Sequence, residues 1–179
     1  MAFHHLALAT TDLAATHRFY TEAMGFTLVH VEDGATDAPD GWFHHALYDT
    51  GDGTLMAFME VHDDRCVDFD PAISRGLGLP SWVNHIAFGV DDLDALDAAQ
   101  LRWLACGQDV VKMRHSHGTS IYTEDPNGNT IEWACDTREF SHEERAAAST
   151  RLLADDLPRD APTDMEFFLA TDFAGARRA

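Results

Sequence analysis

The stretch SWVNHIAFGVDDLDAL, residues 81–96, repeats in register a pattern that the chain already contains near its start, AFHHLALATTDLAA, residues 2–15. A shift of 80 residues pairs His5 with His85, Ala7 with Ala87 and Asp12 with Asp92. Self-similarity at a fixed period indicates a repeated supersecondary unit. The sequence therefore predicts two copies of one structural module.

Each copy begins with a short apolar run followed by a polar turn and a helical pattern. In the turn, Thr11 or Asp91 is placed to cap a helix whose apolar residues recur at helical spacing. Gly25 and Gly107 follow these patterns at the position where helices commonly end. We expect a strand followed by a helix in both copies.

Three strand-like runs follow each helix, over residues 26–32, 41–50 and 54–61 in the first copy and 109–115, 119–125 and 129–136 in the second. The turn sequences TGDGT and DPNGN join the last two runs of each copy as hairpins. Each copy is therefore βαβββ and the fold class α+β. The expected organisation is a module over 1–62, a connector over 63–80, a second module over 81–136 and a C-terminal segment over 137–179.

The C-terminal segment opens with SHEER, in which Ser141 and Glu144 fit a capping box. We expect one helix from about residue 142 to 154, followed by a polar tail. Within that tail, MEFFLATDF at residues 165–173 includes four large apolar residues close together, Met165, Phe167, Phe168 and Leu169, which need a surface to cover, either on the chain's own body or on a partner.

Composition limits the partners of the chain. Thirty-one acidic and twelve basic residues give a net charge of −19, which repels nucleic acid and anionic membranes. No apolar run of about 18 residues is present to span a bilayer. The three cysteines, Cys66, Cys106 and Cys135, suggest neither a disulfide framework nor a cysteine metal site. We expect a cytoplasmic protein that binds neither nucleic acid nor membrane.

These motifs resemble the vicinal oxygen chelate superfamily, which includes glyoxalase I, fosfomycin-resistance proteins and type I extradiol dioxygenases. The resemblance covers roughly residues 3–136, through the HHLAL start, the NHIAF restart and the IYTEDPNGNTIEW ending. It implies that the two modules form a curled mixed sheet around a cleft that holds one divalent metal. It also places the metal ligands on the first strand of each module and on a last strand.

Residues His5, His85 and Glu132 supply that ligand set. Two neutral imidazoles and one carboxylate suit a redox or Lewis-acid metal and leave positions open for substrate. A lone strand histidine is more often a packed residue, but two histidines at equivalent repeat positions favour the metal. The resemblance to extradiol dioxygenases favours Fe(II), with Zn, Mn, Ni and Co as alternatives.

A fourth ligand from the first module is not expected. Aligning the hairpin glycines Gly53 and Gly128 pairs Ala57 with Glu132, whereas Glu60 pairs with Cys135. An odd offset of three residues along a strand points to the opposite face. Glu60 therefore faces away from the metal.

The second module resembles the extradiol dioxygenase signature, in which a histidine and a tyrosine precede the metal glutamate. The resemblance implies that His115 transfers a proton and that Tyr122 hydrogen-bonds the bound substrate, with His117 as the alternative proton carrier. Within the pair His44–His45, it similarly assigns substrate polarisation to His45. At most one member of that pair faces the cleft, because neighbouring strand residues point in opposite directions.

Three functions follow. The first is an Fe(II) extradiol-type dioxygenase that cleaves a small catecholic or aromatic substrate. The second is a non-redox lyase, isomerase or epimerase of the glyoxalase type, and the third is a metal-free binding or resistance protein. Because such modules pair within a chain or between chains, we expect a homodimer.

Overall fold

The computed structural model describes residues 3–66, 68–154 and 164–176. The first module contains β1 (His5–Thr10), α1 (Leu13–Arg18) continued by a π-helical turn η1 (Phe19–Ala23), β2 (Thr27–Ala35), β3 (Trp42–Asp49) and β4 (Leu55–His62). A connector with η2 (Asp64–Cys66) and α2 (Ile73–Gly76) follows. The second module contains β5 (His85–Gly89), α3 (Leu93–Ala105), β6 (Val110–Arg114), β7 (Gly118–Glu124) and β8 (Thr130–Asp136). Both modules are βαβββ, and the α+β fold is confirmed.

The two modules form separate sheets with the same strand order. The first is β1-β4-β3-β2, and the second is β5-β8-β7-β6 extended by one further strand, β9. In both sheets the first strand runs parallel to the last strand of its module, and the other pairs are antiparallel. The register is also equivalent, because Ala7 lies opposite Ala57 and Ala87 lies opposite Glu132. The internal repeat therefore extends to individual residue positions.

The helix caps are Asp12 and Asp92, so the expectation that Thr11 or Asp91 caps these helices is wrong by one residue. The Asp12 and Asp92 side chains each accept from a backbone N–H three residues on, both at 2.8 Å. This is the reach of an N-cap carboxylate. Both helices end at glycines with positive φ, 80° at Gly25 and 85° at Gly107, as their positions predicted.

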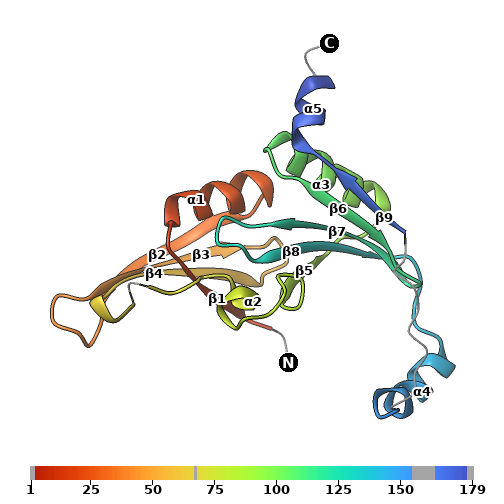
Figure 1. Ribbon diagram of the computed structural model, residues 1–179, viewed down its shortest axis with the longest axis horizontal. Helices are drawn as coiled ribbons and strands as arrows, with labels where there is room; N and C mark the ends of the chain where they lie inside the picture. The colour runs from red at the N-terminus through yellow and green to blue at the C-terminus, as the bar shows by residue number, and fades with distance from the viewer. Residues whose placement is uncertain (1–2, 67, 155–163, 177–179) are drawn as a thin grey trace.

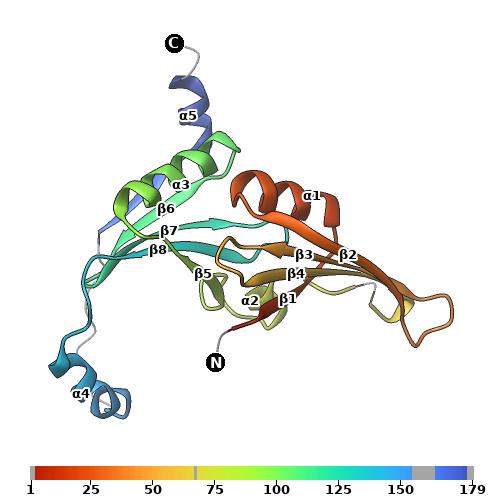
Figure 2. The ribbon, with the colours of Figure 1, turned by 180° about the vertical axis from the view of Figure 1, so that it is seen from behind.

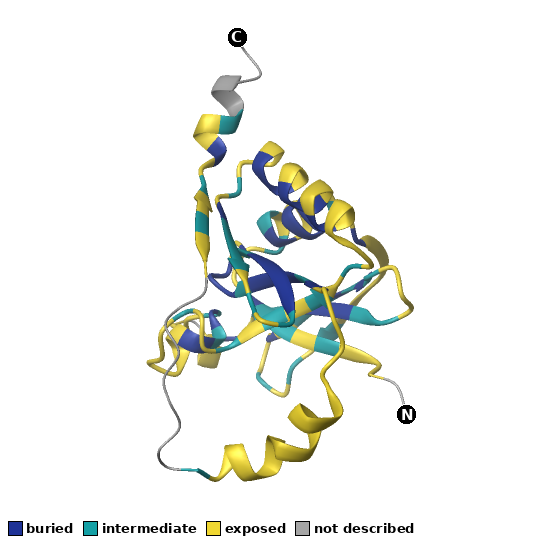
Figure 3. Ribbon diagram, turned by 90° about the vertical axis from the view of Figure 1, so that its right-hand side faces the viewer, coloured by how far each residue is buried: buried dark blue, intermediate teal, exposed yellow. Residues whose placement is uncertain are grey.

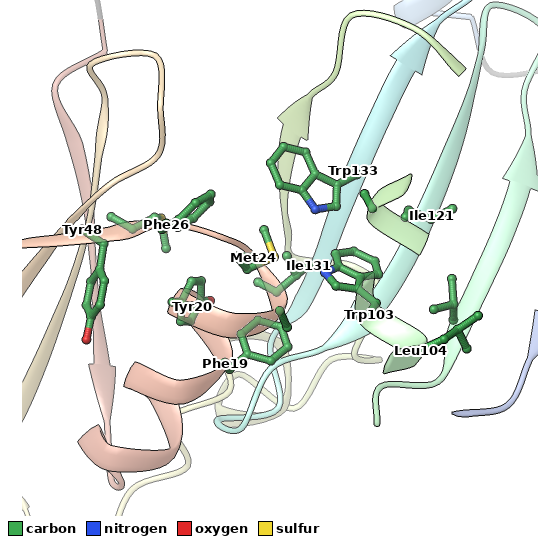
Figure 4. Packing of buried hydrophobic residues seen from close by; sticks show 14 of the residues in the cluster. Phe19, Tyr20, Met24, Phe26, Tyr48, Trp103, Leu104, Ile121, Ile131 and Trp133 are labelled. Atoms are coloured by element: carbon green, nitrogen blue, oxygen red, sulfur yellow. The ribbon is translucent and has the colours of Figure 1, made fainter. Parts of the chain in front are cut away.

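The helix-bearing sides of the two sheets form one common hydrophobic core. Helices α1 and α3 lie on the same side of the sheets (Figures 1 and 2). Figure 4 shows residues from both helices and both sheets packed together, with Phe26 5.1 Å from Phe88 and 6.3 Å from Trp133 between ring centroids. Since side chains alternate along a strand, residues such as His5 and His85 point to the other side. We call this side, turned away from α1 and α3, the far face of each sheet.

A buried polar network joins the modules at the β7–β8 turn. Asn127 donates from Nδ2 to Thr16 Oγ1 at 3.1 Å and accepts from Thr10 Oγ1 at 2.8 Å. The Tyr20 hydroxyl donates to Asp125 Oδ2 at 3.0 Å, and this burial and contact raise the pKa of Tyr20 well above its ordinary value. The DPNGN turn thus fastens the second module to the first.

The C-terminal segment contains the helix expected from about residue 142 to 154, but the expectation of only a polar tail after it is wrong. Helix α4 (His142–Leu152) carries the predicted capping box and stands clear of the sheets (Figure 3). Beyond it, β9 (Met165–Phe168) pairs antiparallel with β6, and α5 (Ala170–Ala176) packs beside α3. The apolar run at 165–173 therefore covers the chain's own sheet edge in part, although Phe167 remains 70% exposed.

Candidate metal and catalytic site

The second module brings His85 and Glu132 together on its far face. The parallel pairing of β5 with β8 sets Glu132 beside Ala87, two residues from His85 on the same face. His85 Nε2 lies 3.1 Å from Glu132 Oε2, and Glu132 is buried with 6% exposure. A buried carboxylate in contact with an imidazole is a pair of donors suited to a divalent cation.

Tyr122 connects this pair to His115. It lies opposite Glu132 on β7 and donates its hydroxyl proton to Glu132 Oε1 at 3.0 Å. His115 Nε2 lies 3.3 Å from the same hydroxyl. The Tyr122 phenol has a single proton, which it donates to Glu132. It therefore accepts the second hydrogen bond, and His115 Nε2 is the donor. Burial, aided by the negative charge of Glu132, raises the pKa of Tyr122 to about 12, so the phenol is protonated at neutral pH.

His117 occupies a second position beside this row. Its ring stacks on His115 at 5.8 Å and contacts Phe140 at 4.9 Å between centroids. These histidines, with His85, Tyr122 and Glu132, line a pocket of about 310 Å³. Of the two proton carriers that the sequence left open, His115 contacts Tyr122, whereas His117 contacts the segment leading to α4.

His5 occupies the position on β1 that His85 occupies on β5, but it lies apart from the pair. Its Nδ1 contacts His4 Nδ1 at 2.7 Å. Across the described ranges, no three side chains of His, Cys, Asp or Glu converge on a metal-binding position. The chain thus presents two ligand candidates in one module and the third in the other.

Glu60 lies on the helix-bearing side of its sheet, as the glycine alignment predicted. Its carboxylate accepts from the Leu13 backbone N–H at 3.1 Å and contacts His62 Nε2 at 3.1 Å. Ala57 stands at the position equivalent to Glu132. The first module therefore offers His5 without a neighbouring carboxylate at the Glu132 position.

His45 and His44 point to opposite faces of the first sheet. His44 lies opposite Glu60 and bonds Asp33, on the helix-bearing side. His45 lies on the far face, as His5 does, with its Nδ1 2.9 Å from Glu32 Oε1. The hydrogen bond from His45 lowers the pKa of Glu32, and His45 Nε2 is buried without a partner among the described residues. The far-face member of the pair is therefore His45, oriented by a carboxylate.

Two contributors were absent from the sequence analysis. Glu32 is recognisable only once the register of β2 against β3 is known, although both strands were predicted. Phe140 lies outside the repeat, and no sequence signal connects it to His117.

Comparisons with known proteins agree with this architecture. The family model described as Glyoxalase/Bleomycin resistance protein/Dioxygenase superfamily matches residues 2–133. A protein named glutathione transferase FosA from Serratia marcescens is 28% identical over 131 residues, which cover 73% of this chain and 78% of that protein. None of the helices within the described residues is long and apolar enough to cross a membrane.

Solved structures share the fold. A lactoylglutathione lyase from Agrobacterium tumefaciens matches with a TM-score of 0.54 and 23% identity, covering 75% of this chain and 92% of that one. The fosfomycin resistance protein FosX from Listeria monocytogenes matches with a TM-score of 0.53 and 18% identity, covering 81% and 98% of the respective chains. With the family model spanning most of its length, the chain belongs to the Glyoxalase/Bleomycin resistance protein/Dioxygenase superfamily.

Proposed function

We propose that the protein is a metal-dependent enzyme of the glyoxalase type, catalysing a non-redox lyase, isomerase or transferase reaction on a small molecule. The observation that carries this proposal is the row His85, Glu132, Tyr122 and His115 on one face of the second module. The names of the relatives, a glutathione transferase and a lactoylglutathione lyase, favour non-redox chemistry over ring cleavage.

One divalent metal is held by His5, His85 and Glu132 in this proposal. Two imidazoles and a carboxylate fit Zn, Mn, Ni, Co or Fe, and the metal supplies Lewis acidity toward substrate oxygens. His85 Nε2 and Glu132 Oε2, now 3.1 Å apart, would both serve as ligands when a metal is bound, and the Tyr122 hydroxyl would keep the Glu132 carboxylate oriented through its 3.0 Å hydrogen bond.

The proposed assembly is a homodimer in which far faces of different modules meet. His5 of one protomer then joins His85 and Glu132 of the partner subunit. The support is that the modules of one chain pack through their helix-bearing sides, which directs both histidine-bearing faces outward. The three cysteines are free, which agrees with the proposed cytoplasmic location.

Proton transfer falls to the histidines in this proposal. His115 Nε2 carries a proton toward the Tyr122 hydroxyl, so the two form a path for moving a proton to or from a substrate. On the far face of the first sheet, His45 has a buried Nε2 without a described partner, while Glu32 holds its other nitrogen. His45 is thus the second proton-transfer candidate.

The test is metal content. Glu132→Ala should abolish stoichiometric metal in protein purified without chelator, whereas Glu124→Ala, a glutamate on the adjacent strand β7, should keep it. Elemental analysis of the unaltered protein and both variants decides the proposal: full metal retention in Glu132→Ala contradicts it, and absence of metal from the unaltered protein leaves the metal-free binding function.

A second candidate is the Fe(II) extradiol-type dioxygenase. The contact of His115 with Tyr122, and of Tyr122 with Glu132, favours it, because the resemblance assigns those two residues to proton transfer and substrate binding. Fe(II)-loaded protein should then consume oxygen with catechols and form a yellow product. No oxygen uptake under air removes this candidate and leaves the non-redox reaction.

A further inference from the structure

Among the described residues, the far faces of both sheets carry histidines, namely His5, His45 and His85, but no lysine or arginine side chain. Of the strands, only β6 contains lysine or arginine, at Lys112 and Arg114. Lys112 and Arg114 lie on the same side of β6 as Val110, which is buried in the core with 1% exposure, and on the side opposite to Val111. They therefore lie on the helix-bearing side of the sheet. Lys112 also pairs with Asp97 at 2.6 Å and Arg114 with Glu166 at 2.6 Å. Neither points toward the Glu132 row.

Basic groups on the neighbouring loops are already engaged by acids. Arg138, just beyond β8, donates both terminal nitrogens to the Glu144 carboxylate at 2.8 Å. In the connector, Arg75 donates to both oxygens of Asp70 at 3.0 and 3.1 Å. Such bidentate pairs leave little positive charge for another anion.

The far faces instead present apolar and small side chains around the proposed metal ligands. In the second sheet, Ala87 and Ala134 flank Glu132, and Val111 and Met113 lie beyond Tyr122. In the first sheet, His45 and Asp49 share the side of His5, and the apolar residues on that side are Ala7, Ala9, Phe43, Leu47, Leu55, Ala57, Met59 and Val61. Their charged neighbours are carboxylates, among them Glu32 and Glu124.

We infer that the substrate is a compound whose two vicinal oxygens meet the metal and whose remaining body is uncharged and apolar, without a phosphonate, phosphate or carboxylate group. This inference rests on the proposed metal site and narrows what that site accepts. An anionic body placed on these faces loses its hydration and gains no lysine or arginine as a permanently charged partner, while nearby carboxylates repel it. An apolar body is stabilised instead, in proportion to the apolar surface that it removes from water.

The experiment uses full-length protein loaded with Co(II) and three probes. Benzohydroxamic acid offers two vicinal oxygens and an apolar ring, 4-carboxybenzohydroxamic acid adds one carboxylate, and fosfomycin is a small phosphonate. Binding is measured by the change in cobalt absorption and by the shift in the thermal unfolding midpoint. We expect benzohydroxamic acid to bind at least about tenfold more tightly than its carboxy analogue, and fosfomycin to cause no change at the same concentration. Equal or tighter binding of either anionic probe overturns the inference.

A variant that adds a positive charge to the far face tests the same inference by changing the protein instead of the probe. Met113→Arg places a cation on the far face of β6, opposite Ser120, and Met113→Gln is a similarly long control without charge. The arginine variant should bring the carboxy analogue to at least the affinity of the uncharged probe, and the glutamine variant should not. A carboxy preference in the glutamine variant, or unchanged selectivity in the arginine variant, contradicts the inference. Cobalt content is measured separately for each protein, so failure of the metal site is distinguished from a wrong substrate class.

Discussion

The β7–β8 turn gives the sharpest test of how the two modules are held together. Asn127 is 3% exposed, and its amide bonds two threonines of the first module, Thr10 and Thr16, which are 1% and 0% exposed. The two threonine hydroxyls also contact each other at 2.8 Å. Replacing Asn127 by Ala therefore removes one donor and one acceptor from a site that excludes water.

The expected cost follows from this count of bonds. Two neutral hydrogen bonds contribute about 1 to 3 kcal/mol together, and leaving a buried donor unpaired costs about 1 to 3 kcal/mol. After the substitution, one threonine hydroxyl can still donate to the other, but the second hydroxyl proton has lost its acceptor. These contributions overlap, so we expect Asn127→Ala to lower the free energy of unfolding by about 2 to 4 kcal/mol.

The assay is urea unfolding followed by circular dichroism and tryptophan fluorescence. Asn84→Ala is the matched control, because the Asn84 amide nitrogen is buried without a partner among the described residues, and its loss should cost less than about 1 kcal/mol. Thr16→Val, alone and combined with Asn127→Ala, should show coupling of about 1 kcal/mol. If Asn127→Ala is no more destabilising than Asn84→Ala, the proposed role of the turn is refuted.

Three further outcomes are expected. Glu60→Ala should leave metal content unchanged while lowering thermal stability slightly, since Glu60 accepts from the Leu13 N–H on the side away from the site; metal loss equal to that of Glu132→Ala would restore a four-ligand site. In metal-free folded protein, tyrosinate absorption at 295 nm at pH 10 should be clearly lower than in the unfolded chain, because burial raises the pKa of all three tyrosines, that of Tyr122 to about 12. The protonated phenols then stabilise the fold fully below pH 10, and this stabilisation is lost as the pH rises toward 12; half-complete ionisation at pH 10, as in the unfolded chain, would contradict this. Deleting residues 157–179 should lower the unfolding midpoint, because β9 covers the β6 edge, and an unchanged midpoint would show that the pairing is absent in solution.

The sequence by itself determined the repeated module and the face on which each strand residue lies. Strand parity and hairpin glycines are local, so an offset counted from Gly53 and Gly128 was enough to make Ala57 equivalent to Glu132 and to turn Glu60 away. Likewise, the Tyr122 to Glu132 spacing lies within a single hairpin, whose turn fixes the register. These parts of the candidate site follow from contacts between residues close along the chain.

Tertiary structure alone decided how the modules pack and what their loops contact. The bond from Asn127 to Thr16 spans 111 residues, and the pairing of β9 with β6 joins a terminal segment to an interior strand. The separation of His5 from His85 and Glu132 likewise depends on which faces of two sheets bury apolar area against each other. The apolar area buried over the whole interface between the modules decides which faces of the sheets pack together. No short stretch of sequence reveals this, because a strand with the same alternating pattern can bury its apolar face against the other module of its own chain or against a module of another chain.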